Sequence, residues 1–99
     1  MALTERQKKH LRRLGHALRP IVRVGQRGLN PGVTEELRLA LLHHELVKLQ
    51  VRTGSRELRD AMLSELARAT LSELVYRIGN IGLFYKKNNE IQKILLPDS

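Results

Sequence analysis

The sequence predicts a single α/β domain in which three helices pack on a four-stranded mixed sheet, with the element order α-β-α-β-α-β-β. Segments with helical spacing of apolar residues alternate with short β-branched segments, which is typical of strand–helix–strand units with parallel neighbouring strands. A Gly-Asn pair between the last two apolar segments predicts an antiparallel hairpin. The 99 residues suit one domain and include no linker, so residues 1–99 are expected to fold together, with 86–99 as a tail.

The first helix is predicted over residues 4–17. Thr4 and Gln7 have the spacing of a capping box at its start. Gly15 is a candidate C-cap, and Pro20 prevents the helix from continuing. Apolar residues at helical spacing are expected to face the core, namely Leu11, Leu14 and Leu18.

A short strand, a G-x-x-G loop and a helix start follow. Residues 20–24 are rich in β-branched side chains and predict the strand. Residues 25–28 form the loop, and Asn30 and Pro31 are favoured cap and first-turn residues of the next helix. Glycine lets the backbone approach another molecule, and a helix N-terminus presents unpaired N–H groups and a positive dipole end. With the charge of Arg27, this pattern favours a phosphate, above all in a nucleic-acid backbone. No Gly-Lys-Ser/Thr follows, so the loop is not a nucleotide-binding P-loop.

The second helix is predicted to continue to about residue 44. Residues 46–52 then alternate between apolar and polar side chains, which predicts a strand with one face buried. A turn at 53–55 follows, in which Ser55 caps a third helix that ends near Thr70. The residues expected to face inward are Val33, Leu37, Ala40, Leu41 and His44 on the second helix, and Leu58, Ala61, Met62, Leu66 and Ala69 on the third.

Residues 73–78 and 81–86 predict the two strands of the hairpin, and apolar residues in the tail indicate that it docks on the domain. Aromatic side chains are scarce. Phe84 and Tyr85 are neighbours on a strand and must point to opposite faces, so at most one can be presented to a ligand. This favours recognition of backbone and shape, as in structured RNA, over the stacking of bases on aromatic rings.

The positive charge is concentrated at one end of the chain. The net charge is +8, and residues 1–28 hold eight Lys or Arg and one Glu, whereas residues 29–99 hold ten basic and nine acidic residues. A basic face without interspersed acids indicates a polyanionic partner. Together with the loop, this predicts an RNA-binding surface made of Arg6, Lys9, Arg13, Arg23, Gly25, Gln26, Arg27 and Gly28.

Several function classes are disfavoured. The chain has no cysteine, which excludes disulfides and thiolate metal sites, and it has no G-x-S-x-G motif or carboxylate cluster, so no catalytic residue, cofactor or small-molecule substrate is expected. His43 and His44 point about 100° apart on a helix, which favours a helix-end and packing role over a metal site. No apolar run is long enough to span a membrane, so we expect a cytoplasmic protein with no membrane partner. A monomer is the default expectation.

The chain resembles the bacterial single-domain, YhbY-type members of the CRM family (chloroplast RNA splicing and ribosome maturation). The resemblance covers nearly the whole chain and is carried by the basic helix and by the following motifs: Gly25-Gln26-Arg27-Gly28-Leu29, His43-His44-Glu45-Leu46-Val47-Lys48-Leu49, Ile78-Gly79 and Leu83-Phe84-Tyr85. It implies a fold similar to the C-terminal domain of bacterial initiation factor three. It also implies RNA binding by the loop and nearby basic surface, and association with precursors of the large ribosomal subunit.

The chain departs from the family pattern at the hairpin. Relatives commonly carry arginine where this chain has Lys86, and bulkier or basic residues at Asn80 and Gly82. The resemblance therefore supports RNA contact by the loop more than by the hairpin.

The expected function is that of a non-enzymatic protein that binds ribosomal RNA in large-subunit precursors as an assembly factor. The alternative is a ribosome-associated protein-interaction module without direct RNA contact. DNA binding is a weaker third hypothesis, because the sequence shows no helix suited to reading a major groove.

Overall fold

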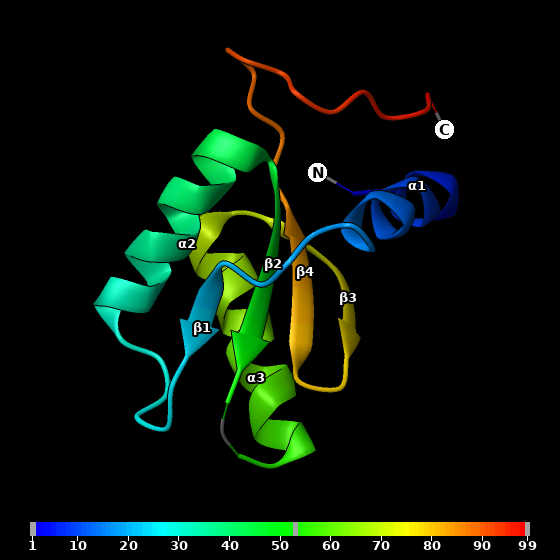
Figure 1. Ribbon diagram of the computed structural model, residues 1–99. Coiled ribbons are helices and arrows are strands. Elements are labelled where there is room, and N and C mark those ends of the chain that lie inside the picture. Colours follow the sequence, from blue (N-terminus) through cyan, green and yellow to red (C-terminus); the bar gives the residue numbers. More distant parts are fainter. Residues whose placement is uncertain (1, 53, 99) are drawn as a thin grey trace.

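The computed structural model describes residues 2–52 and 54–98, in which three helices and four strands follow the predicted order (Figure 1). Every boundary lies within two residues of its prediction, and Thr53 of the predicted turn is outside the described residues. The elements are α1 Glu5–Gly15, β1 Val22–Val24, α2 Pro31–His44, β2 Leu46–Val51, α3 Arg56–Thr70, β3 Glu73–Ile78 and β4 Ile81–Tyr85.

The four strands form one mixed sheet in the order β1-β2-β4-β3. β1 runs parallel to β2, with Val22 opposite Leu49, because the connection through α2 returns the chain in the same direction. β4 is antiparallel to both β2 and β3. The β3–β4 turn has Gly79 at φ +60°, a conformation that favours glycine. The predicted mixed sheet and terminal hairpin are therefore confirmed.

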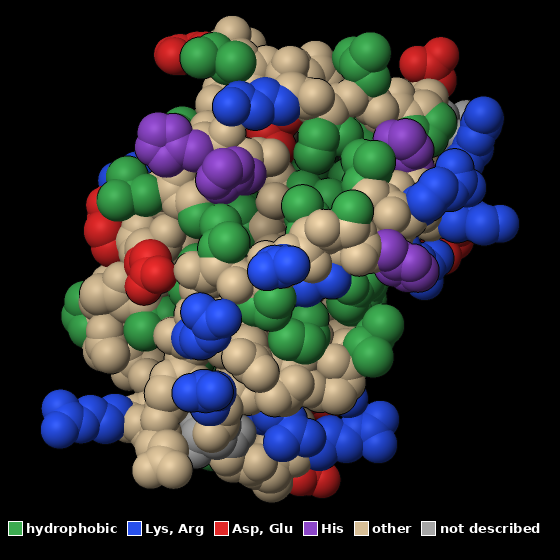
Figure 2. Space-filling view, viewed as in Figure 1, with side chains coloured by type: hydrophobic (Ala, Val, Ile, Leu, Met, Phe, Trp, Pro, Cys, Tyr) green, Lys and Arg blue, Asp and Glu red, His purple; other side chains and the backbone are tan. Residues whose placement is uncertain are grey.

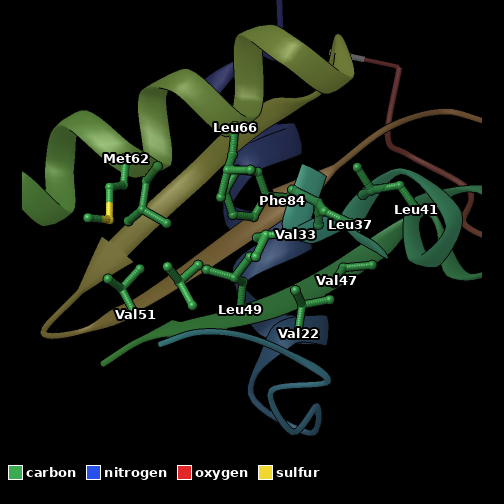
Figure 3. Close-up of a cluster of buried hydrophobic side chains, with 12 residues drawn as sticks. Val22, Val33, Leu37, Leu41, Val47, Leu49, Val51, Met62, Leu66 and Phe84 are labelled. Atoms are coloured by element: carbon green, nitrogen blue, oxygen red, sulfur yellow. The ribbon is translucent and has the colours of Figure 1, made fainter. Parts of the chain in front are cut away.

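The larger core lies between the sheet and the helices α2 and α3. Figure 3 shows Met62 and Leu66 from α3 pointing toward Phe84 and the strands, with the α2 side chains alongside them. The fully or nearly fully buried members are Val22, Val24, Val33, Leu37, Leu41, Val47, Leu49, Val51, Met62, Leu63, Leu66 and Phe84. This cluster fixes α2, and with it the loop that precedes α2, against β1.

The inward face of α3 differs from the prediction. Leu58, Ala61 and Ala69 are exposed, whereas Leu63 and Thr70 are buried. Met62 and Leu66 are buried as predicted, and Thr70 can lie inward beside them because its hydroxyl donates a hydrogen bond to the Leu66 carbonyl oxygen at 2.7 Å. A threonine that satisfies its hydroxyl within the helix can replace an apolar residue in the core. On α2, His44 is exposed as well and does not belong to the apolar stripe.

α1 packs on the opposite face of the sheet with a narrower contact than predicted. Leu11 is buried, but Leu14 and Leu18 remain 38% and 37% exposed. Gly15 is a buried packing residue and not the C-cap, which is His16. A Cβ at Gly15 would lie 2.8 Å from Leu83 Cδ2. The helix therefore approaches β4 through its glycine, which leaves the neighbouring leucines at the edge of the contact.

The tail is docked on the domain, as its apolar residues predicted, and a buried carboxylate that was not predicted holds it. Glu45 joins α2 to β2 at φ +62° and is inaccessible to solvent. Its oxygens accept hydrogen bonds from the backbone N–H groups of Asn88 at 2.7 Å, Lys93 at 2.5 Å and Ile94 at 2.8 Å. Ile94 then packs beside α1 against the second, smaller core cluster. Together with a hydrogen bond from Asn88 Nδ2 to the Leu42 carbonyl oxygen at 3.0 Å, the Glu45 side chain holds residues 88–94 across the end of α2.

Candidate nucleic-acid interface

Residues 25–28 form a tight turn between β1 and α2. The Gly28 N–H donates to the Gly25 carbonyl oxygen at 3.1 Å, so Gln26 and Arg27 occupy the corners of the turn, where both are exposed. The Asn30 side chain caps α2 by accepting a hydrogen bond at 3.1 Å from the N–H of Val33, the third residue of the helix. The predicted cap is confirmed, and the loop leads directly to the positive end of the α2 dipole.

The two glycines of the loop have different structural roles. Gly28 has φ +77°, and a Cβ there would lie 3.4 Å from Met62 Cε, so the backbone conformation itself favours glycine. Gly25 has no such φ, and nothing lies within 4 Å of the place where its Cβ would be. Neither the fold nor the packing requires glycine at position 25. Its effect is to leave the backbone bare beside Arg27.

The predicted residues of α1 lie together. Arg6, Lys9 and Arg13 line one shallow hollow of about 320 Å³, together with His10 and with Pro97 of the tail. Their spacing along the sequence places them on one side of the helix. This gives a compact basic patch that is anchored by the packing of α1 and by the docked tail.

The loop and the α1 patch are separated by the open face of the sheet. α1 contacts β2, β3 and β4 and lies at the upper right of Figure 1, whereas the loop that follows β1 lies at the lower left. Arg23 is exposed on β1, between the buried Val22 and Val24 that face α2, so it points to the same side of the sheet as α1. Figure 2 shows Lys and Arg side chains across this side, with few Asp or Glu side chains among them. The structure therefore places the predicted RNA-binding residues in two groups, the α1 patch and the 25–28 loop, with Arg23 between them.

Three acidic residues pair with cations outside this surface. Glu35, Glu65 and Asp60 pair with Arg38, Arg68 and Arg77, and the hydrogen bond from Arg38 lowers the pKa of Glu35. On α1, Glu5 lies 3.7 Å from Lys8. Within residues 2–52 and 54–98, no carboxylate comes within 4 Å of Lys9, Arg12, Arg13, Arg19, Arg23 or Arg27. The charges of these six residues are thus available to an external anion.

The hairpin aromatics do not form a stacking platform. Phe84 and Tyr85 point to opposite faces as predicted, but both are buried because helices or the tail cover both faces at that point. Burial raises the pKa of Tyr85, and the nearby charge of Glu45 raises it further. His43 and His44 are exposed at the end of α2. In the part of the chain that the structure describes, no group of three or more His, Asp or Glu side chains could hold a metal ion.

The comparisons with known proteins agree with this architecture. The family profile of the CRS1/YhbY (CRM) domain matches residues 3–86. The chain belongs to this family. A CRM relative from Pseudomonas aeruginosa, named as a probable RNA-binding protein, is 43% identical over 96% of this chain and 91% of its own length. A Haemophilus influenzae relative named as an RNA-binding protein is 39% identical over 96% of this chain and 95% of its own.

The CRM fold is also confirmed by a solved structure. The solution structure of a hypothetical protein from Staphylococcus aureus, described as a candidate RNA-binding protein, superposes with a TM-score of 0.84 at 33% identity. The match covers 97% of this chain and all of the other. No described helix of this CRM protein is both long enough and apolar enough to cross a membrane.

The end of the sheet that carries the loop also carries two arginines that the sequence analysis did not single out. Arg52 directly follows β2, and Arg59 lies in the second turn of α3. The sequence could have indicated Arg52, because parallel strands such as β1 and β2 end at the same edge of a sheet. The turns after the two strands were therefore bound to lie close together.

Proposed function

We propose that this CRM protein binds RNA, and that its target is a structured ribosomal RNA element in precursors of the large ribosomal subunit. It would assist assembly in the cytoplasm as a monomer and without catalysis. Membership of the CRM family and the names of the relatives support RNA as the partner. The concentration of basic residues on one side of the molecule supports it independently.

The bare backbone at Gly25 is the observation that carries the proposal. The fold does not require glycine at position 25. The bare backbone there lies two residues before the exposed Arg27 and leads to a capped helix N-terminus, so a phosphate can approach it closely. In this mechanism the loop N–H groups and Arg27 hold one phosphate. Arg23 and the α1 patch of Arg6, Lys9 and Arg13 contact phosphates further along the RNA. Such contacts supply affinity and orientation, not sequence choice.

Reversing the charge of Arg27 tests the loop. Because Arg27 is exposed and pairs with no described carboxylate, Arg27→Glu should leave the thermal unfolding midpoint nearly unchanged. It should weaken RNA binding at least tenfold, which is about 1.4 kcal/mol. The control for RNA affinity is Arg68→Glu, the same reversal at an exposed residue of α3 outside the proposed surface; because Arg68 pairs with Glu65, its unfolding midpoint is measured separately. Equal affinity of Arg27→Glu and the parent protein would exclude the loop as a contact.

Sedimentation of a cell lysate tests the ribosomal target. The protein should migrate with particles at or just below the large subunit at low salt and leave them as salt rises, because phosphate contacts release counterions. Migration as a free small protein at both salt concentrations would contradict the proposal.

One observation favours the alternative of a protein-interaction module. Leu14, Leu18 and Ile21 remain partly exposed and line an apolar hollow of about 420 Å³ between α1, β2 and the tail. Pull-down after RNase treatment separates the two functions. A ribosomal protein retained without RNA would support a direct protein contact, whereas loss of all ribosomal components would support RNA binding.

A further inference from the structure

A second basic hollow opens at the same end of the sheet as the loop. It has a volume of about 480 Å³ and lies where β2 ends, α3 begins and the β3–β4 hairpin turns. Figure 1 shows these three connections and the 25–28 loop gathered at one end of the molecule. The lining residues are Gln50, Val51, Arg52, Gly54, Arg59 and Asn80.

Backbone hydrogen bonds fix this hollow beside the loop. The Arg52 N–H donates to the Val24 carbonyl oxygen at 2.8 Å, and Val24 is the residue before the loop. The Val51 N–H donates to the Asn80 carbonyl oxygen, also at 2.8 Å. On the α3 side, the missing Cβ of Gly28 faces Met62, which is one helical turn after Arg59. The hollow and the loop are thus neighbours joined by the sheet.

Arg59 is held in place with hydrogen-bonding capacity left over. Its Nη1 donates to the Gly54 carbonyl oxygen at 3.1 Å, while its Nε is buried without a partner in the described chain. Gly54 has φ +78°, and a Cβ there would lie 2.6 Å from Leu58 Cδ2, so the turn that positions Arg59 is itself constrained. Because Nε is closed to solvent, the Nη groups are the part of the guanidinium that can donate to a phosphate oxygen, and the bond to Gly54 holds them at the hollow.

The composition of the lining selects for an anion. The described lining residues include two arginines and two residues with side-chain amides, Gln50 and Asn80, and no Asp or Glu. The acids of the first turns of α3, Glu57 and Asp60, do not line it, and Asp60 pairs with Arg77. Two positive charges beside neutral donors, open to solvent, match a phosphate group.

We propose that this hollow binds a phosphate of the RNA backbone, next to the phosphate held by the 25–28 loop. Arg52 and Arg59 supply the charge, and Gln50 and Asn80 donate from their amides. The inference rests on the proposed RNA binding and extends it. The RNA contact then includes an arginine pair outside the basic N-terminal part of the chain, so one end of the sheet holds two adjacent phosphates.

The salt dependence of binding to an RNA hairpin tests the assignment. Arg52→Gln should lower the slope of log affinity against log salt by about one, as expected for the loss of one phosphate contact. Because Arg52 is exposed, its thermal unfolding midpoint should not change. Arg59→Gln should act in the same direction. The control is Arg68→Gln, which removes the same charge elsewhere on α3 and should leave the slope unchanged.

The outcomes separate this inference from the proposed function. If the parent protein binds the RNA and Arg27→Glu weakens that binding, but Arg52→Gln and Arg59→Gln keep the parent slope, the hollow is not an RNA contact. If the parent protein binds no RNA, the proposed function itself fails, and this inference with it.

Titration with inorganic phosphate, followed by amide chemical shifts of Gly54 and Asn80, identifies the source of the phosphate. Shifts that Arg52→Gln abolishes, combined with an unchanged RNA slope, would assign the hollow to free phosphate and overturn the RNA assignment. A reduced RNA slope in both arginine variants supports it.

Discussion

Replacing Glu45 with alanine should release the C-terminal tail and lower the free energy of unfolding by about 2–4 kcal/mol. The carboxylate accepts three backbone hydrogen bonds, and such bonds to a charged group contribute about 1.5–3 kcal/mol each. Removing a buried carboxylate also recovers its desolvation cost of several kcal/mol, which offsets part of that gain. An alanine at position 45 keeps the unfavourable positive φ, so the change in the free energy of unfolding reflects the loss of the carboxylate alone.

Hydrogen exchange of individual amides is the decisive assay, with chemical denaturation giving the free energy. In Glu45→Ala, the amides of Asn88, Lys93 and Ile94 should lose protection together. The amide of Val51, which bonds to Asn80 within the sheet region, should keep it. Unchanged protection of the three tail amides, or a change in stability below about 0.5 kcal/mol, would refute the reasoning, because that is the range of ordinary surface substitutions.

Glu45→Gln provides a graded control. One oxygen, Oε1, accepts from both Lys93 and Ile94, whereas Oε2 accepts from Asn88. Glutamine retains one acceptor and places an NH₂ group where the other oxygen was. Asn88 should then lose protection while Lys93 and Ile94 keep it, with a loss of stability smaller than that of alanine.

Three further predictions concern Tyr85 and two glycines. The Tyr85 pKa is raised above its usual 10.0, so the native state resists ionisation; stability is complete below about pH 10 and declines as pH rises toward the native pKa. Tyr85→Phe should remove this decline in alkaline denaturation curves and cost little at neutral pH, since the buried hydroxyl has no partner in the described chain. Gly82→Ala should destabilise by about 1–3 kcal/mol in thermal or chemical unfolding, because its Cβ would lie 2.8 Å from Leu63 Cδ2. Gly25→Ala meets no atom within 4 Å, so it should leave the unfolding midpoint unchanged and weaken RNA binding several-fold; a matching loss of stability would contradict this explanation of the loop.

The elements were predictable because their limits depend on local chemistry. Thr4 with Gln7, Asn30 and Ser55 cap the three helices as the sequence indicated, since a cap involves residues only three positions apart. The hairpin followed from its Gly-Asn turn, and its pairing was confirmed. The family and its fold could likewise be recognised from motifs along the chain.

The faces of the helices were less predictable, because several rotations satisfy one apolar pattern. Gly15 lets α1 approach Leu83 closely, and Thr70 can be buried on α3 because its hydroxyl bonds to the Leu66 carbonyl oxygen. Leu83 lies far from Gly15 in the sequence, and whether Thr70 is buried depends on how α3 packs, although its hydrogen-bond partner is local. For the candidate site, the geometry of the loop followed from sequence, whereas its separation from the α1 patch did not. The assignment of these residues to RNA stays a prediction.

The sequence by itself determined the order and type of the elements, the helix caps, the hairpin and the uneven distribution of charge, because each depends on composition or on contacts over a few residues. Only the tertiary structure decided that Glu45 is buried under the tail and that Arg52 and Arg59 line one hollow beside the loop. These features join residues far apart in the chain, and their environment is set by which surfaces the packed sheet leaves open. A side chain's charge can be known from its identity, but its partners are known only from the fold.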